Sequence, residues 1–282
     1  MSILQAIILG IVQGLTEFLP ISSSGHLIIV PWALDWHFFL ENPGLNKTFD
    51  VALHLGTLVA VVAYYWRELG RLATGFLRSL RKRRIETTDE RLAWLLLIST
   101  IPAGIVGVVF EDIIVTRLGE PWQIAIMMIV FGGVMWIVDS RARRDREIGD
   151  VRWKGALGIG IAQALALAPG VSRSSVTMVA GLLLGLDRAS AARYSFLMSV
   201  PVIAGAAAFS SVGVIQDGLP AGMATPFAAG MVSAAVSGFA AIWFLLAYLR
   251  RHDFKPFAIY RFVLAAGILL LVVAGMRPAT GI

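Results

Sequence analysis

Residues 10–26 read GIVQGLTEFLPISSSGH, an apolar helical pattern interrupted by Pro20 and a run of three serines. Residues 160–177 read GIAQALALAPGVSRSSVT and follow the same plan, with their interruption at Pro169 and the polar run SRSS. Each apolar arm is short for a full crossing, because a spanning helix needs about 20 residues. Both stretches therefore predict a helix–break–helix hairpin that enters and leaves by one face. Irregular backbone at that depth is tolerated only where it lines a cavity.

The chain as a whole is apolar enough for a polytopic membrane protein. Of its 282 residues, 57% are hydrophobic and 15% are charged, and the mean hydropathy is +0.78. Soluble domains carry about 25% charged residues, so a soluble, disordered or fibrous protein is excluded. The absence of cysteine excludes a disulfide scaffold, an iron–sulfur site and a thiolate zinc site. We predict an all-α fold with two hairpins and six transmembrane helices, at about 49–66, 92–110, 120–139, 190–212, 224–249 and 257–275.

The basic residues give the predicted orientation. The chain has 24 Lys and Arg against 18 Asp and Glu. The basic residues gather in the segments 67–91, 139–154 and 250–261. The positive-inside rule predicts that these segments face the cytoplasm, and that the loops at 35–48, 111–121 and 213–223 face outward. Since apolar spans flank every basic cluster, membrane lipids are the expected partner and nucleic acid is not.

The two broken stretches also indicate an internal repeat. A shift of 150 residues aligns them, and each is followed by three predicted crossings. An odd number of crossings puts the second hairpin on the opposite face from the first. We predict one membrane domain over residues 1–282, with inverted halves at about 1–140 and 150–282. Secondary transporters use this plan and bind where broken helices meet, so a carrier and an intramembrane enzyme both stay open at this point.

Ionisable residues inside a membrane are costly and indicate function. The first break offers Glu17 and His26, with Gln13 on the same helix face as Glu17. The second break offers Arg173, with Thr177 one turn later. If the two tips meet, they suit a phosphorylated substrate, because a guanidinium matches phosphate oxygens in a two-point contact.

Helix N-termini after each break would favour an anion. Glu17 is a natural ligand for a hard divalent cation that shares the phosphate oxygens. His26 is a candidate general base or nucleophile, and Ser23 is the alternative nucleophile.

Structural roles compete with each of these functional roles. Ser22 and Ser172 could be N-caps and nothing more. Gln13 could serve a helix–helix hydrogen bond, and Arg173 could be a structural partner of Glu17. His54, in an apolar span, is assigned to packing or interhelical bonding.

The segments 13–26 and 169–177 resemble the two signature motifs of the bacterial undecaprenyl-diphosphatase family, also called the bacitracin-resistance proteins. The motifs stand in the family's order, and the hydrophobic pattern matches along essentially the whole chain. The resemblance implies an inner-membrane enzyme that hydrolyses undecaprenyl diphosphate to undecaprenyl phosphate and phosphate. That reaction recycles the lipid carrier for peptidoglycan synthesis and gives bacitracin resistance. It also implies a requirement for Mg²⁺ or Ca²⁺ and a site open to the outer face.

The resemblance carries roles over by position. Glu17 would be the acidic-motif carboxylate and metal ligand, and Glu17, Ser23, His26 and Arg173 would form the catalytic set. The substrate-binding residues would be Gln13, Ser22, Ser24, Ser172, Ser174 and Thr177. The first position of the acidic motif is the neutral Gln13 here, which leaves Glu17 as its one anionic ligand. The alternative function is a transporter or flippase of a phosphorylated prenyl lipid, and a homodimer stays open as the oligomeric state.

Overall fold

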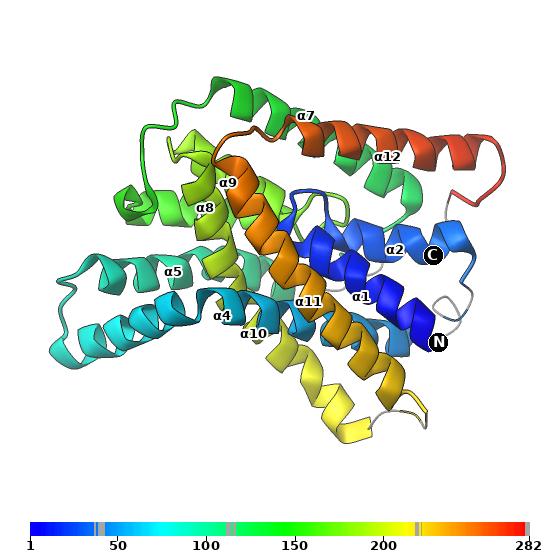
Figure 1. The fold of residues 1–282 in the computed structure, drawn as a ribbon, viewed down its shortest axis with the longest axis horizontal. Helices are drawn as coiled ribbons and strands as arrows, with labels where there is room; N and C mark the ends of the chain where they lie inside the picture. The colour runs from blue at the N-terminus through cyan, green and yellow to red at the C-terminus, as the bar shows by residue number, and fades with distance from the viewer. Residues whose placement is uncertain are drawn as a thin grey trace.

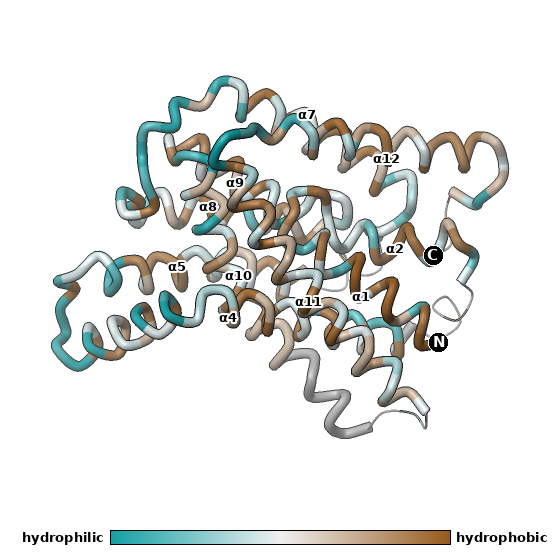
Figure 2. Tube along the Cα trace, in the orientation of Figure 1, coloured by the Kyte–Doolittle hydropathy of each residue, from teal (hydrophilic) through white to brown (hydrophobic). Residues whose placement is uncertain are grey.

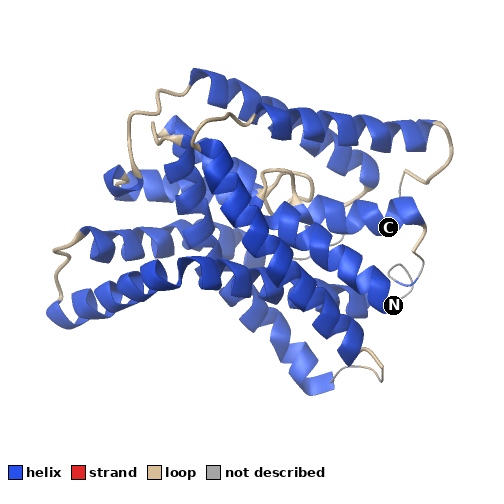
Figure 3. Cartoon of the chain, in the orientation of Figure 1, coloured by secondary structure: helices blue, strands red, loops and turns tan. Residues whose placement is uncertain are grey.

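The computed structural model describes residues 1–36, 38, 43–110, 114, 117–217, 220 and 222–279. In this part of the chain the ordered elements are helices (Figure 3), apart from one isolated bridge between Arg146 and Leu186. Their order is α1 (Ile3–Phe18), α2 (Ser23–Leu34), α4 (Pro43–Lys82), α5 (Thr88–Val109), α7 (Pro121–Arg141), the short 3₁₀ helix η1 (Ile148–Asp150), α8 (Trp153–Leu165), α9 (Arg173–Leu183), α10 (Arg188–Asp217), α11 (Ala224–Leu249) and α12 (Lys255–Val273). The predicted all-α class is confirmed.

Six helices within the described residues are long and apolar enough to cross a membrane, as the sequence predicts. They are α4, α5, α7, α10, α11 and α12. The first is longer than its predicted span of 49–66, because α4 continues through basic residues to Lys82 and bends at Tyr65, where φ is −103° and ψ is 18°. Parts of the three loops predicted to face outward lie outside the described residues.

Both predicted breaks are present, between α1 and α2 and between α8 and α9. These four helices have 16, 12, 13 and 11 residues, all shorter than a full crossing. Ser22 (φ 79°, ψ 94°) and Ser172 (φ 78°, ψ 111°) share an unusual backbone conformation, and each caps the helix that follows. A non-glycine residue with positive φ costs about 1–3 kcal/mol, and such strain clusters at functional sites. The entry of each hairpin by one face and the inverted orientation of the halves stay predictions.

Close backbone packing fixes the first hairpin in the bundle. Helix α1 lies against α11 (Figure 1). A Cβ atom on Gly14 would lie 2.5 Å from the carbonyl oxygen of Ala234 and closer still to the hydroxyl of Ser237. Small residues allow this approach, as in other membrane helix pairs. The contact holds α1 in place one turn before Glu17.

The remaining helices pack in pairs around the two breaks. Helix α5 lies against α8, α4 against α11, and α7 beside α12, which run together along the upper edge of Figure 1. The hydrophilic connections between α4 and α5 and between α7 and α8 lie toward the left of Figure 2, and the one between α11 and α12 lies near its upper middle. These connections contain 8 of the 18 basic residues of the three clusters, and the other ten lie in the helices themselves.

Candidate active site

The two breaks are in direct contact. The hydroxyl of Ser22 accepts a hydrogen bond from the backbone N–H of Gly170 (3.1 Å), and the hydroxyl of Ser174 donates to the carbonyl oxygen of Leu19 (3.0 Å). Ser22 also caps α2 by accepting from the N–H of Gly25. The structural role considered for Ser22 is therefore real, and the same hydroxyl joins the two hairpins.

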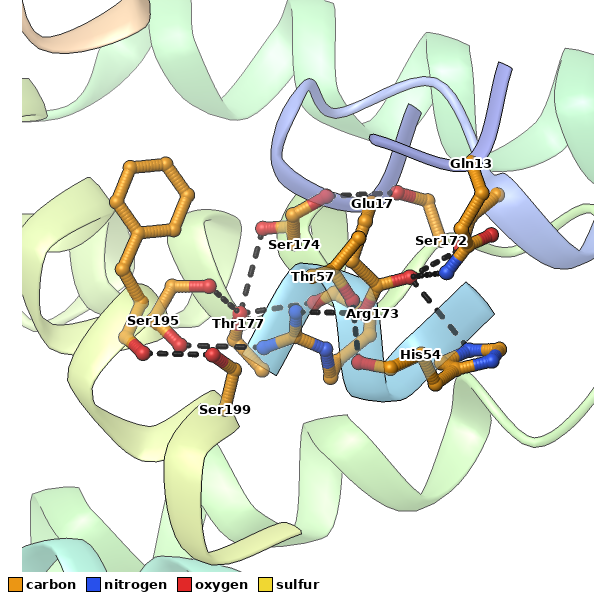
Figure 4. Close-up of polar contacts among 12 residues, drawn as sticks. Gln13, Glu17, His54, Thr57, Ser172, Arg173, Ser174, Thr177, Ser195 and Ser199 are labelled. Atoms are coloured by element: carbon orange, nitrogen blue, oxygen red, sulfur yellow. Dashed lines mark hydrogen bonds and ion pairs between the residues drawn. The ribbon is translucent and has the colours of Figure 1, made fainter. Parts of the chain in front are cut away.

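Glu17 is the centre of this junction (Figure 4). Its side chain is 5% exposed. Gln13 Nε2 and Ser23 Oγ donate to Glu17 Oε2 at 3.0 and 2.6 Å, and Arg173 Nη2 donates to Oε1 at 2.9 Å. Ser23 and Arg173 are the first residues of α2 and α9. The junction therefore brings the first residue of both helices onto one carboxylate.

Some N–H donors of the Arg173 guanidinium are not used in hydrogen bonds. Its Nη1 donates to the carbonyl oxygen of Ser195 (3.2 Å), while its Nε is buried without a partner. Thr177 Oγ1 donates to the Arg173 carbonyl (2.8 Å) and shares a hydrogen bond with Ser195 Oγ (2.7 Å). Two of the five guanidinium N–H donors are engaged, so an anion could bind without breaking the ion pair to Glu17.

A pocket of about 310 Å³ opens beside this pair. The two breaks contribute acidic, hydroxyl and guanidinium groups, α4 contributes charged and imidazole groups, and α10 contributes apolar ones. Its lining includes Glu17, Ser23, Ser24, Lys47, Asp50, His54, Ser172, Arg173, Val202, Ile203, Ala206 and Ala207. The cavity therefore has a polar end and an apolar wall, which is what a lipid diphosphate needs.

His54, assigned from sequence to packing or interhelical bonding, contacts Glu17 of another helix and also lies at the pocket. Its Nε2 lies 3.7 Å from Glu17 Oε2 (Figure 4), and the side chain lines the pocket. Its Nδ1 lies 2.7 Å from the carbonyl oxygen of Asp50 and donates to it, since a carbonyl only accepts. The spacing of Lys47, Asp50 and His54 at three and four residues is the signal for one polar helix face that could have identified them.

His26 points elsewhere. Its Nδ1 lies 2.6 Å from the Ser22 carbonyl oxygen, its Nε2 lies 2.7 Å from the hydroxyl of Tyr260, and the two rings stack. His26 is buried and is not among the residues that line the pocket. The catalytic role given to His26 stays a prediction, and the contacts visible here hold the first break in shape.

Arg261 corrects one part of the sequence interpretation, which assigned it to a cytoplasmic cluster. The residue lies inside α12 and is 0% exposed. Its guanidinium donates to carbonyl oxygens of both breaks, those of Pro20, Gly170 and Val171, and to two in α7, those of Met127 and Met128. Linear closeness to Arg250, Arg251 and Lys255 concealed this role, because α12 begins at Lys255 and carries Arg261 into the bundle.

The sequence profile of a family described as "Bacitracin resistance protein BacA" matches residues 6–267. The chain belongs to this family. It is 48% identical over 266 residues to the undecaprenyl-diphosphatase of Moorella thermoacetica, which covers 94% of this chain and 96% of that protein. It is 45% identical over 273 residues to the undecaprenyl-diphosphatase of Desulforudis audaxviator (97% and 98% covered) and 43% identical over 277 residues to that of Pelobacter propionicus (98% and 99%). The resemblance drawn from the two motifs is confirmed.

In this BacA-family chain, a divalent cation would find oxygen ligands beside Glu17. Gln13 Oε1 is buried without a hydrogen-bond partner, while Gln13 Nε2 is bonded to Glu17. Among the described residues, no three His, Asp or Glu side chains form a group that could hold an ion alone. The donor set therefore fits Mg²⁺ in its common mode, held by one or two protein oxygens together with substrate phosphate oxygens and water.

Proposed function

We propose that this protein is an integral membrane undecaprenyl-diphosphatase. The observation that carries the proposal is the buried Glu17–Arg173 pair, which joins the two hairpins at a pocket with a polar end and an apolar wall. The name shared by the three relatives supplies the substrate class. The reaction would release phosphate and return undecaprenyl phosphate for peptidoglycan synthesis, which accounts for bacitracin resistance.

Arg173 binds the diphosphate in this proposal. Its unused N–H donors suit phosphate oxygens, and the N-termini of α2 and α9 add their positive dipole ends. Ser24 and Ser172 line the same pocket and can donate hydroxyl hydrogen bonds. The apolar residues of α10 accommodate the first prenyl units.

Ser23 is the nucleophile that the geometry favours. Its hydroxyl donates to Glu17 at 2.6 Å and faces the pocket, so Glu17 can accept its proton as the oxygen attacks the terminal phosphorus. The bond from that phosphorus to the bridging oxygen breaks, and undecaprenyl phosphate leaves with the electron pair. Water then hydrolyses the phosphoserine, which releases inorganic phosphate and restores Ser23.

A divalent cation would be held by Glu17 and Gln13 Oε1. When bound, it would supply a positive charge that stabilises the phosphate oxygens. Arg173 remains the protein's own cation at the same place and needs no rearrangement to act. The inner membrane and a pocket open to the outer face complete the proposal, in agreement with the distribution of basic residues.

Phosphate release from a prenyl diphosphate by the purified protein in detergent tests the proposal. Hydrolysis needs no sealed compartment, whereas transport by a flippase does. We expect release by the wild type and a trapped phosphoserine at Ser23 on rapid acid quench. A protein that is inactive in detergent but moves the lipid in sealed vesicles would refute the proposal in favour of the flippase.

A further inference from the structure

A second region of positive charge lies at the opposite end of α9 from Arg173. A pocket of about 600 Å³ is lined by the last turn of α7, the segment 142–146 and the end of α9. A neighbouring pocket of about 630 Å³ shares Asp145, Arg146 and Leu184 with it. Together they are lined by five arginines and two aspartates, a surplus of three positive charges: Arg91, Arg141, Arg143, Arg146, Arg152, Asp145 and Asp150. We call this the arginine pocket.

The arginine pocket has a fixed backbone. The N–H of Arg146 donates to the Gly185 carbonyl (2.9 Å), and the N–H of Asp187 donates to the Arg146 carbonyl (2.9 Å). The Arg146 guanidinium donates to the Leu184 carbonyl (3.1 Å). The segment after α7 is thus held to the segment after α9 by hydrogen bonds. A basic loop that only set the membrane orientation would not require this attachment.

Three of the arginines are available to a ligand. Arg141, Arg143 and Arg152 are exposed, and their guanidinium groups have no hydrogen-bond or ion-pair partner within the described chain. Other arginines are paired, such as Arg188 with Asp139 at 2.6 Å and Arg193 with Glu68 at 2.6 Å. All five cations of the pocket are arginine, the side chain whose planar fork matches phosphate oxygens.

Apolar side chains adjoin the positive charge. Ile137 and Leu183 line the first pocket and are 51% and 70% exposed. Ile137 belongs to α7, which is apolar and long enough to cross a membrane, and Leu183 is the last residue of α9. A free phosphate ion would use the arginines and leave these side chains in contact with water, whereas a phospholipid would cover both.

From this pairing of charge and apolar surface, we propose that the arginine pocket binds the headgroup of an anionic phospholipid, with Ile137 and Leu183 against its acyl chains. Basic pockets between transmembrane helices bind lipid headgroups in this way. The site is separate from the Glu17 pocket and does not depend on the proposed hydrolysis.

Native mass spectrometry of the purified full chain tests the proposal, with dioleoylphosphatidylglycerol or dioleoylphosphatidylcholine added to the detergent. We expect the wild type to retain phosphatidylglycerol over phosphatidylcholine. The triple variant Arg141→Gln, Arg143→Gln, Arg152→Gln should retain about 10²-fold less phosphatidylglycerol, since each juxtamembrane arginine contributes about 1 kcal/mol to anionic lipid binding. Its prenyl diphosphate hydrolysis in detergent should equal that of the wild type.

The matched control removes the same charge elsewhere. Arg81→Gln, Arg83→Gln, Arg84→Gln changes three exposed arginines at the end of α4 and in the turn after it, and should leave retention unchanged. Equal loss in both triple variants, equal retention of the two lipids, or displacement of the lipid by equimolar inorganic phosphate would each overturn the proposal. If the glutamine variant does not fold, the corresponding Arg→Lys triple replaces it. That variant keeps the charge without the planar fork and should bind more weakly than the wild type; equal binding would also count against the site.

Discussion

Glu17→Gln tests the centre of the site with almost no change of volume. The substitution removes the negative charge that faces Arg173 at 2.9 Å, while the guanidinium stays only 13% exposed. Removing one partner of a buried ion pair costs about 3–5 kcal/mol, because the other charge is left uncompensated. The amide also replaces one acceptor by a donor, and where its nitrogen takes the place of Oε2 it accepts neither from Gln13 Nε2 nor from Ser23 Oγ.

The expected consequences are separate losses of stability and of activity. Phosphate release should fall by about 10²–10³-fold, as for the loss of one preorganised electrostatic contact in an active site. Thermal unfolding in detergent should occur at a lower temperature. In Glu17→Gln with Arg173→Gln, both charges are absent, so stability should recover toward the wild type while activity stays lost.

The control is Glu68→Gln. Glu68 pairs with Arg193 at 2.6 Å and is 12% exposed, away from the catalytic pocket. This variant should lose stability and keep most of its specific activity. If Glu17→Gln kept wild-type activity, or if the double variant were less stable than either single one, the central role of the Glu17–Arg173 pair would be refuted.

Four further predictions follow from the contacts. Ser23→Ala should reduce phosphate release by at least about 10²-fold and abolish any trapped phosphoenzyme, as expected when a nucleophile is lost; a phosphohistidine in that variant would contradict the assignment. His54→Gln should raise the KM for the prenyl diphosphate with little change in the unfolding temperature, because the side chain lines the pocket. His26→Gln should instead lower the unfolding temperature, since both of its ring nitrogens are bonded. The reverse pattern would exchange the roles of the two histidines. Gly14→Leu should destabilise the fold by at least about 1–3 kcal/mol through overpacking against α11, measured by thermal unfolding beside Gly104→Leu, where a Cβ would meet nothing within 4 Å. Excess EDTA should suppress phosphate release and added Mg²⁺ or Ca²⁺ should restore it, while full activity in the chelator would exclude the cation proposed at Glu17 and Gln13.

The hydropathy pattern predicts the membrane spans well because the apolar residues of each span are consecutive in the sequence. A run of about 20 apolar residues must form a helix in lipid whatever its neighbours are. The two breaks were equally visible, since Pro20 and Pro169 interrupt otherwise apolar segments beside serines. The same reasoning identifies candidate site residues, because a polar residue within an apolar stretch stands out in the sequence alone. These candidates include Glu17, Arg173 and Ser23.

The partners of those residues depend on contacts between distant segments. Arg173 meets Glu17 across 156 residues, and His26 meets Tyr260 across 234. Nothing in the local pattern distinguishes a histidine that faces a pocket from one that supports a break. The sequence interpretation therefore assigns His54 to packing or interhelical bonding without placing it at the pocket, and it groups the buried Arg261 with exposed cations.

The sequence by itself determined the membrane class, the six apolar spans, the two broken segments and the residue types suited to a diphosphate, because hydropathy and motif chemistry are properties of short stretches. Only the tertiary structure decided which of those polar groups share one carboxylate, which line the pocket and which support the backbone. Most buried polar groups form their hydrogen bonds with whatever the fold brings within about 3 Å. That partner is set by how the helices pack, not by residues nearby in the chain.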